Sequence, residues 1–160
     1  MDTLTVFYIE LTVALIVFAV VAKRYVLPKL YEMSFYGALV PLLLVSASRV
    51  TGLNFMVGQV TNNLAAEFAK TAGYGDFTVA LIALVAALLL IKKNKLGYIL
   101  AWLYAVLGAA DFIYALYLGN QYDMPLHLGA SWYNVTLAGP AMMVTVVLIW
   151  VVLLKHPKKD

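Results

Sequence analysis

Four ionisable residues lie inside or at the edge of stretches that are otherwise apolar enough to cross a bilayer: Glu10, Arg49, Asp76 and Asp111. Each residue belongs to a different stretch. A charge in hydrocarbon costs at least about 2.5 kcal/mol even on lenient insertion scales, so such residues are usually paired or functional. Their types predict a site that binds a proton, a cation or a small ligand with a charged group.

The charges in this set are unbalanced. Three carboxylates accompany one guanidinium, and arginine stays protonated throughout. Three explanations remain open: one or more carboxyls is neutral, the layer is hydrated, or a cation binds there.

Other polar groups are expected at the same level. Pro140 cannot donate a backbone hydrogen bond and is expected to free the carbonyl of Thr136. Gly139 beside it would allow a ligand or another backbone to approach, and Asn134 lies just above this break. Tyr114 belongs to an aromatic group on the same side, most of which is typical of an interfacial belt. We therefore include Asn134 and Tyr114 among the candidate ligand-binding residues.

The elements that must position these residues are membrane helices. The chain has 160 residues, of which 64% are hydrophobic and 12% charged, whereas a soluble domain is about half apolar and a quarter charged. Five segments are long enough to span, so we expect a single all-α transmembrane domain over residues 1–160. The predicted spans of this five-helix bundle are residues 4–22, 34–55, 76–91, 96–118 and 132–154.

The basic residues predict the orientation of the bundle. Nine of the eleven fall on one side if there are five spans, the N-terminus is outside and the C-terminus is cytoplasmic. We expect a bacterial or archaeal cytoplasmic membrane. These nine residues are Lys23, Arg24, Lys29, Lys92, Lys93, Lys95, Lys155, Lys158 and Lys159.

Counting at ~1.5 Å per residue places all four charged residues roughly 6–9 Å below the outer edge of the hydrocarbon. Helical spacing also places Arg49 and Asp111 each on a shared stripe of its helix, which predicts that both face the interior of the bundle. The stripes are Leu42, Ser46, Arg49 and Gly52 on the second span, and Gly97, Tyr104, Gly108 and Asp111 on the fourth.

Two linkers have predicted structure of their own. Residues 61–71 have apolar residues at helical spacing and predict a short interfacial helix between the second and third spans. Residues 119–131 predict an ordered or partly re-entrant loop.

Each candidate also has a structural interpretation. Arg49 with Asp111 could be a clamp that fixes helix packing, and Asp76 could simply cap the third helix. Asp123 and His127 alone do not predict a metal site. The absence of cysteine, and of histidine or lysine within the spans, argues against iron–sulfur, haem and retinal cofactors. We expect no cofactor, no metal and no nucleic-acid partner.

The preferred hypothesis is a small membrane protein with an outward-facing polar pocket in the outer leaflet. It would bind or transport a small cationic, protonatable or amphipathic ligand. The first alternative is a structural or regulatory subunit, and the second is an enzyme using paired carboxylates on a lipidic substrate. No catalytic motif is present, which favours a protein that is not an enzyme. Small-residue spacings such as Ala83 and Ala87 permit self-association without predicting it.

In length and number of spans the chain resembles the tryptophan-rich sensory or translocator proteins, which bind lipophilic ligands. It contains only Trp102, Trp132 and Trp150. The resemblance therefore concerns size and topology, and no residue role is carried over from it.

Overall fold

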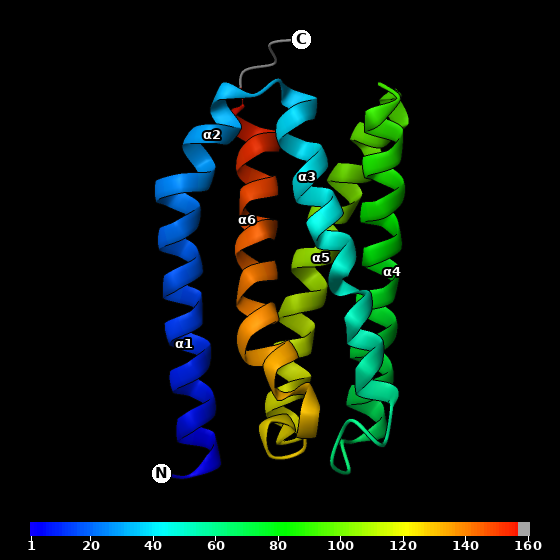
Figure 1. Cartoon of the computed structure of the whole chain (residues 1–160). Helices are drawn as coiled ribbons and strands as arrows, with labels where there is room; N and C mark the ends of the chain where they lie inside the picture. The colour runs from blue at the N-terminus through cyan, green and yellow to red at the C-terminus, as the bar shows by residue number, and fades with distance from the viewer. Residues whose placement is uncertain (157–160) are drawn as a thin grey trace.

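The computed structural model describes residues 1–156, and this part of the chain is helical with no strand. Five of its helical segments are long and apolar enough to cross a membrane. They lie side by side along one axis (Figure 1), as expected for an integral membrane protein with an all-helical fold. The segments are Thr3–Glu32, Phe35–Met56, Ala66–Ile91, Lys95–Gln121 and Gly129–Lys155.

The first segment comprises α1 (Thr3–Val21), a π-helical turn η1 (Ala22–Val26) and α2 (Leu27–Glu32). Asp2 caps α1 by accepting a hydrogen bond from the Thr5 backbone N–H at 2.7 Å. Bonds from the Thr5 backbone and hydroxyl lower the pKa of the Asp2 carboxyl. Only Phe7 of α1 is buried, and α1 packs against the last segment at the edge of the bundle (Figure 1).

The second segment joins α3 (Phe35–Ala47) to η2 (Ser48–Met56), a 3₁₀ helix. Its nine residues make η2 unusually long, since 3₁₀ runs beyond three or four residues are uncommon. At three residues per turn, Arg49, Gly52 and Phe55 share one face, and all three are buried. The stripe predicted for this helix is likewise buried at Leu42 and Ser46.

The third segment is one helix, α4 (Ala66–Ile91), which begins ten residues before the predicted span. The helical spacing seen in residues 61–71 therefore marks the first turns of α4 rather than a separate helix. Gly73 and Gly75 do not break it, because η2 and α5 pack closely against them. Asp76 lies inside α4, so its interpretation as a helix cap is wrong.

The fourth segment is α5 (Lys95–Gln121). Gly97, Tyr104 and Gly108 of its predicted stripe are buried. A loop with two short 3₁₀ turns follows, η3 (Met124–Leu126) and η4 (Gly129–Ser131). The last segment then continues through a π-helical turn, η5 (Asn134–Ala138), into α6 (Gly139–Lys155).

Two loops cover the end of the bundle that carries the N-terminus. Residues 57–62 and 122–131, here called the loop cover, are joined by backbone hydrogen bonds from Asn62 to His127 at 2.9 Å and from Ala130 to Val60 at 2.7 Å. The His127 ring Nδ1 lies 3.0 Å from the Asn62 carbonyl oxygen. The loop predicted at residues 119–131 is therefore held by specific contacts.

The interior has two parts. The main core fills the bundle on the side of the C-terminus, where fully buried alanines such as Ala83 and Ala101 let α4 and α5 approach closely. A smaller group, here called the end cluster, lies beneath the loop cover. It consists of Phe7, Phe55, Phe68, Ala69, Ala72, Leu118, Met124 and Leu128.

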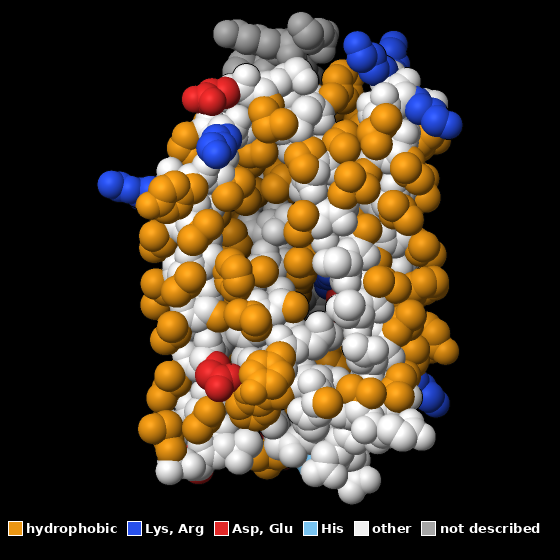
Figure 2. Space-filling model, in the orientation of Figure 1, with side chains coloured by type: hydrophobic (Ala, Val, Ile, Leu, Met, Phe, Trp, Pro, Cys, Tyr) orange, Lys and Arg blue, Asp and Glu red, His pale blue; other side chains and the backbone are white. Residues whose placement is uncertain are grey.

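The surface of the bundle is apolar along its length (Figure 2). Basic side chains gather at the end opposite the N-terminus, as the distribution along the sequence predicts. Lys158 and Lys159 lie outside the described residues. Which end faces the cytoplasm remains a prediction.

Candidate functional site

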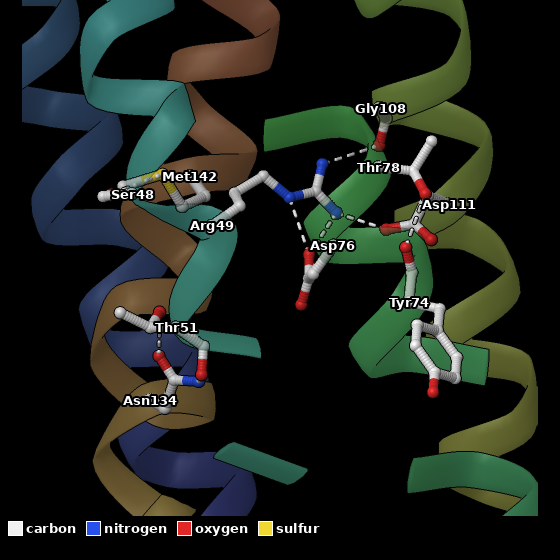
Figure 3. A network of polar contacts seen from close by, with 10 residues as sticks. All are labelled: Ser48, Arg49, Thr51, Tyr74, Asp76, Thr78, Gly108, Asp111, Asn134 and Met142. Carbon is white, nitrogen blue, oxygen red and sulfur yellow. Dashed lines mark hydrogen bonds and ion pairs between the residues drawn. The ribbon is translucent and has the colours of Figure 1, made fainter. Parts of the chain in front are cut away.

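Arg49 joins three helices through its guanidinium group (Figure 3). Its Nε donates to Asp76 Oδ1 at 2.7 Å, and its Nη2 lies 2.7 Å from the same oxygen. Nη2 also donates to Asp111 Oδ2, and Nη1 donates to the Gly108 carbonyl at 3.2 Å. The Phe112 ring centroid lies 4.0 Å from the guanidinium carbon. Arg49, Asp76 and Asp111 are here called the Arg49 cluster.

The Arg49 cluster is buried within the bundle. The Arg49 side chain is 2% exposed, against 19% for Asp76 and 15% for Asp111. A charge-assisted pair in such a site is strong, and either partner alone would be costly. The inward orientation predicted for Arg49 and Asp111 is observed.

Two glycines make room for the carboxylates. A Cβ on Gly52 would overlap the Asp76 carboxylate, and a Cβ on Gly75 would overlap the Asp111 carboxylate. Each carboxylate therefore packs directly on the backbone of a neighbouring helix. The absence of a side chain at these two glycines is therefore required for the position of both acids.

Each acid has one carboxylate oxygen that Arg49 does not contact. Within the described chain, Asp76 Oδ2 and Asp111 Oδ1 accept no hydrogen bond. Tyr104 lies nearby with its hydroxyl fully buried and without a hydrogen-bond partner among these residues. The cluster thus retains acceptor atoms and one hydroxyl that its internal contacts do not use.

The Arg49 cluster forms the inner wall of a cavity. Its volume is about 110 Å³, and one water molecule needs about 10–15 Å³ by this measure. Arg49, Asp76 and Asp111 all line it, and most of the remaining wall is apolar. The other lining residues are Leu11, Ser48, Thr51, Phe55, Phe68, Ala72, Phe112, Ala115, Leu116, Met124, Asn134, Val135, Ala138, Gly139, Met142 and Met143.

The predicted helix break also reaches the cavity. The Gly139 N–H bonds to the Asn134 carbonyl, five residues back, so a π-helical turn stands directly before Pro140. Gly139 lines the cavity. The Asn134 side chain contacts Thr51, whose hydroxyl donates to Asn134 Oδ1 at 3.1 Å. π-helical turns are often found at functional sites.

Glu10 and Tyr114 do not join the Arg49 cluster. Glu10 Oε2 accepts a hydrogen bond from the Trp132 indole N–H at 2.6 Å. Because α1 packs against the last segment, Glu10 faces Trp132, two residues before η5, rather than η2. Tyr114 is 52% exposed, stacks on Tyr117 and does not line the cavity.

Several cavity residues had no signal in the sequence. Ser48, Met142 and Met143 are ordinary residues of an apolar helix, and only the packing brings them to the same space. Trp132, the hydrogen-bond partner of Glu10, likewise had no signal in the sequence. The i, i+3 spacing of Ser48 and Thr51 places both on one face of η2.

Comparison with known proteins identifies the family of the chain. No curated protein and no solved structure matches it. One family model, described as "Domain of unknown function (DUF8737)", matches residues 6–154. The match covers nearly all of the five helical segments and every residue of the Arg49 cluster. The chain therefore belongs to the family of the domain of unknown function DUF8737.

Proposed function

We propose that this protein binds a small amphipathic ligand with a cationic group in the cavity beside the Arg49 cluster. The observation that carries the proposal is the composition of the cavity wall. Two carboxylates and one guanidinium stand at its inner end, and apolar side chains make up most of the rest.

The charge of the cluster favours a cation. With both acids ionised, Asp76 and Asp111 outweigh Arg49 by one negative charge. An uncompensated charge is costly where water is scarce, so a bound ammonium group would lower the free energy of the site. The unused oxygens of the two acids would accept its hydrogen bonds. Arg49 would hold the carboxylates in place.

The apolar wall favours a ligand with a short apolar body. Phe55 and Phe68 close one side, and Met142 and Met143 face the cavity from α6. Methionine side chains adapt to ligands of different shape because they are unbranched and flexible. The site suits a class of small amphipathic amines better than one rigid molecule.

The test compares two probes of equal chain length, octylammonium and octanoate, on protein in lipid nanodiscs with empty nanodiscs as background. The wild type is expected to bind the amine at least about tenfold more tightly than the acid, a difference of about 1.4 kcal/mol. Asp76→Asn and Asp111→Asn are each expected to lose at least that factor. Glu67→Gln, an exposed acid on the same helix as Asp76, is the matched control.

Equal affinity for the two probes, or unchanged amine binding in both asparagine variants, would contradict the proposal. Transport of the ligand is a separate question, answered by flux of the same amine into sealed liposomes. It requires binding first, so the variants that lose binding must also lose any flux.

A structural or regulatory subunit is the second candidate. The observation that favours it is the saturation of Arg49, whose guanidinium contacts Asp76, Asp111 and Gly108 on two other helices. In that case Asp111→Asn would lower the stability of the protein, and neither probe would bind the wild type. An enzyme acting on lipids through Asp76 and Asp111 remains a prediction, tested by incubation with a membrane lipid extract.

A further inference from the structure

The cavity is closed toward the loop cover. Phe55 and Phe68 line it and also belong to the end cluster, where their rings pack edge to face with centroids 5.7 Å apart. Met124 closes the same wall from η3. Beyond them the two loops are joined by backbone hydrogen bonds from Asn62 to His127 and from Ala130 to Val60. A ligand arriving along the bundle axis from this end would have to displace all of these groups.

The cavity is also closed toward the opposite end. There the main core is tightly packed, and Leu39, Leu43 and Ile149 have no exposed surface. Arg49 itself points from η2 across the bundle toward α4 and α5 (Figure 3). Neither end of the bundle therefore gives direct access.

The side of the bundle is different. Ser48 and Thr51 line the cavity and are both surface-exposed, while Asn134 and Met142 face them from the last segment and are partly exposed. Ser48 approaches the Met142 sulfur at 3.9 Å, and Thr51 contacts Asn134. Figure 2 shows a hollow partway along this face, with basic and acidic atoms visible at its base. Ser48, Thr51, Asn134 and Met142 are here called the side opening.

The side opening lies in apolar surface. Leu44 and Val45 precede Ser48 and are exposed by 43% and 48%, and Leu137 follows Asn134 and is exposed by 54%. In a membrane this surface faces lipid chains, because five apolar helices form the whole bundle. The two hydroxyls and the amide of the side opening form a short polar path from the surface to the carboxylates.

We propose that the ligand is an amphiphilic amine dissolved in the bilayer, which enters sideways between η2 and the last segment. Its ammonium group passes Ser48, Thr51 and Asn134 to reach Asp76 and Asp111. Its apolar chain remains in the side opening, against the surrounding lipid. The class of ligand rests on the proposed function, whereas the route of entry can be tested without any ligand.

The experiment uses the absence of cysteine in the chain. Ala72, which lines the cavity and is 4% exposed, is replaced in the variant Ala72→Cys. The protein in liposomes is treated with N-dodecylmaleimide, which partitions into lipid, or with a charged maleimide that stays in water on both sides. The variant Ala83→Cys on the same helix is the matched control, because Ala83 is fully buried and does not line the cavity.

Ala72→Cys is expected to react at least about tenfold faster with N-dodecylmaleimide than with the charged maleimide, because the dodecyl chain concentrates the reagent in lipid. Ala83→Cys should react with neither reagent. Adding Ser48→Phe to Ala72→Cys should block the side opening. The rate of labelling by N-dodecylmaleimide should then also fall about tenfold. Thr61→Phe in the loop cover should leave the rate unchanged.

Faster reaction with the charged maleimide would overturn the lateral route. So would no reaction with either reagent while Ile113→Cys, at a 70% exposed position, reacts with N-dodecylmaleimide. These outcomes are separate from ligand binding. Lateral labelling without octylammonium binding would refute the proposed function alone, and octylammonium binding with labelling from water would refute the lateral route alone.

Discussion

At the scale of single residues, Arg49 is the contact on which the site depends. Its replacement by alanine would leave Asp76 and Asp111 buried without a compensating charge. We expect Arg49→Ala to lose about 3–5 kcal/mol of stability, seen as loss of monodisperse protein and a lower unfolding midpoint in detergent. Arg24→Ala is the control, since Arg24 is exposed at the basic end. Normal folding of Arg49→Ala would show that the acids do not need this cation.

The glycines beneath the carboxylates give a second prediction. Gly52→Ala and Gly75→Ala each place a methyl group where a carboxylate oxygen lies, so the acid must move away from Arg49. Overpacking of this kind costs about 1–3 kcal/mol, measured as a lower unfolding midpoint. Gly58→Ala should behave like the wild type, because a Cβ at Gly58 meets nothing within 4 Å. An unchanged midpoint in both site variants would mean that the acids do not need this close approach.

Glu10 and Trp132 form a contact that is separate from the Arg49 cluster. A buried hydrogen-bonding group left without its partner costs about 1–3 kcal/mol, so Glu10→Ala and Trp132→Phe should each destabilise the attachment of α1 to the last segment. The double variant should lose little more than either single one, as a thermodynamic cycle of unfolding midpoints would show. Fully additive losses would place the two residues in separate interactions.

At the scale of elements, the π-helical turn before Pro140 sets the position of Asn134. Pro140→Ala restores a backbone donor, which favours an α-helical turn and rotates Asn134 away from Thr51. We expect unchanged or higher stability with weaker octylammonium binding. Pro28→Ala is the matched control, since Pro28 follows the other π-helical turn, far from the cavity. If Pro140→Ala binds octylammonium as tightly as the wild type, the π-helical turn does not contribute to binding.

Local periodicity explains which parts of the site could be predicted. Arg49 and Asp111 lie on polar stripes at helical spacing, and such a stripe specifies the inward face of its own helix. The pattern carries no information on which helices are neighbours. α1 is apolar on all sides because lipid and core favour the same residues. The sequence therefore does not indicate which way Glu10 faces or which residue it contacts. Gly73 and Gly75 likewise look like a helix boundary, although they are contact points inside α4.

At the scale of the whole molecule, the orientation in the membrane follows from charge alone and can be measured directly. We predict that the loop cover is outside and the basic end is cytoplasmic. Gln59→Cys should react with an impermeant maleimide on intact cells. Glu32→Cys, exposed at the other end, should react only after permeabilisation. The reverse pattern would invert the topology and place the cavity in the cytoplasmic leaflet.

The long 3₁₀ helix also has a consequence for the thickness of membrane that the bundle can match. The second segment has 22 residues, against 26 and 27 in the next two, yet it runs between the same two ends (Figure 1). A 3₁₀ helix rises about 2.0 Å per residue and an α-helix about 1.5 Å, so the nine residues of η2 gain about 4–5 Å in length. That extra length offsets most of the difference in length between the second segment and the next two. The conformation that presents Arg49 to the acids therefore also lets the shortest helix of the bundle match the hydrophobic length of its neighbours.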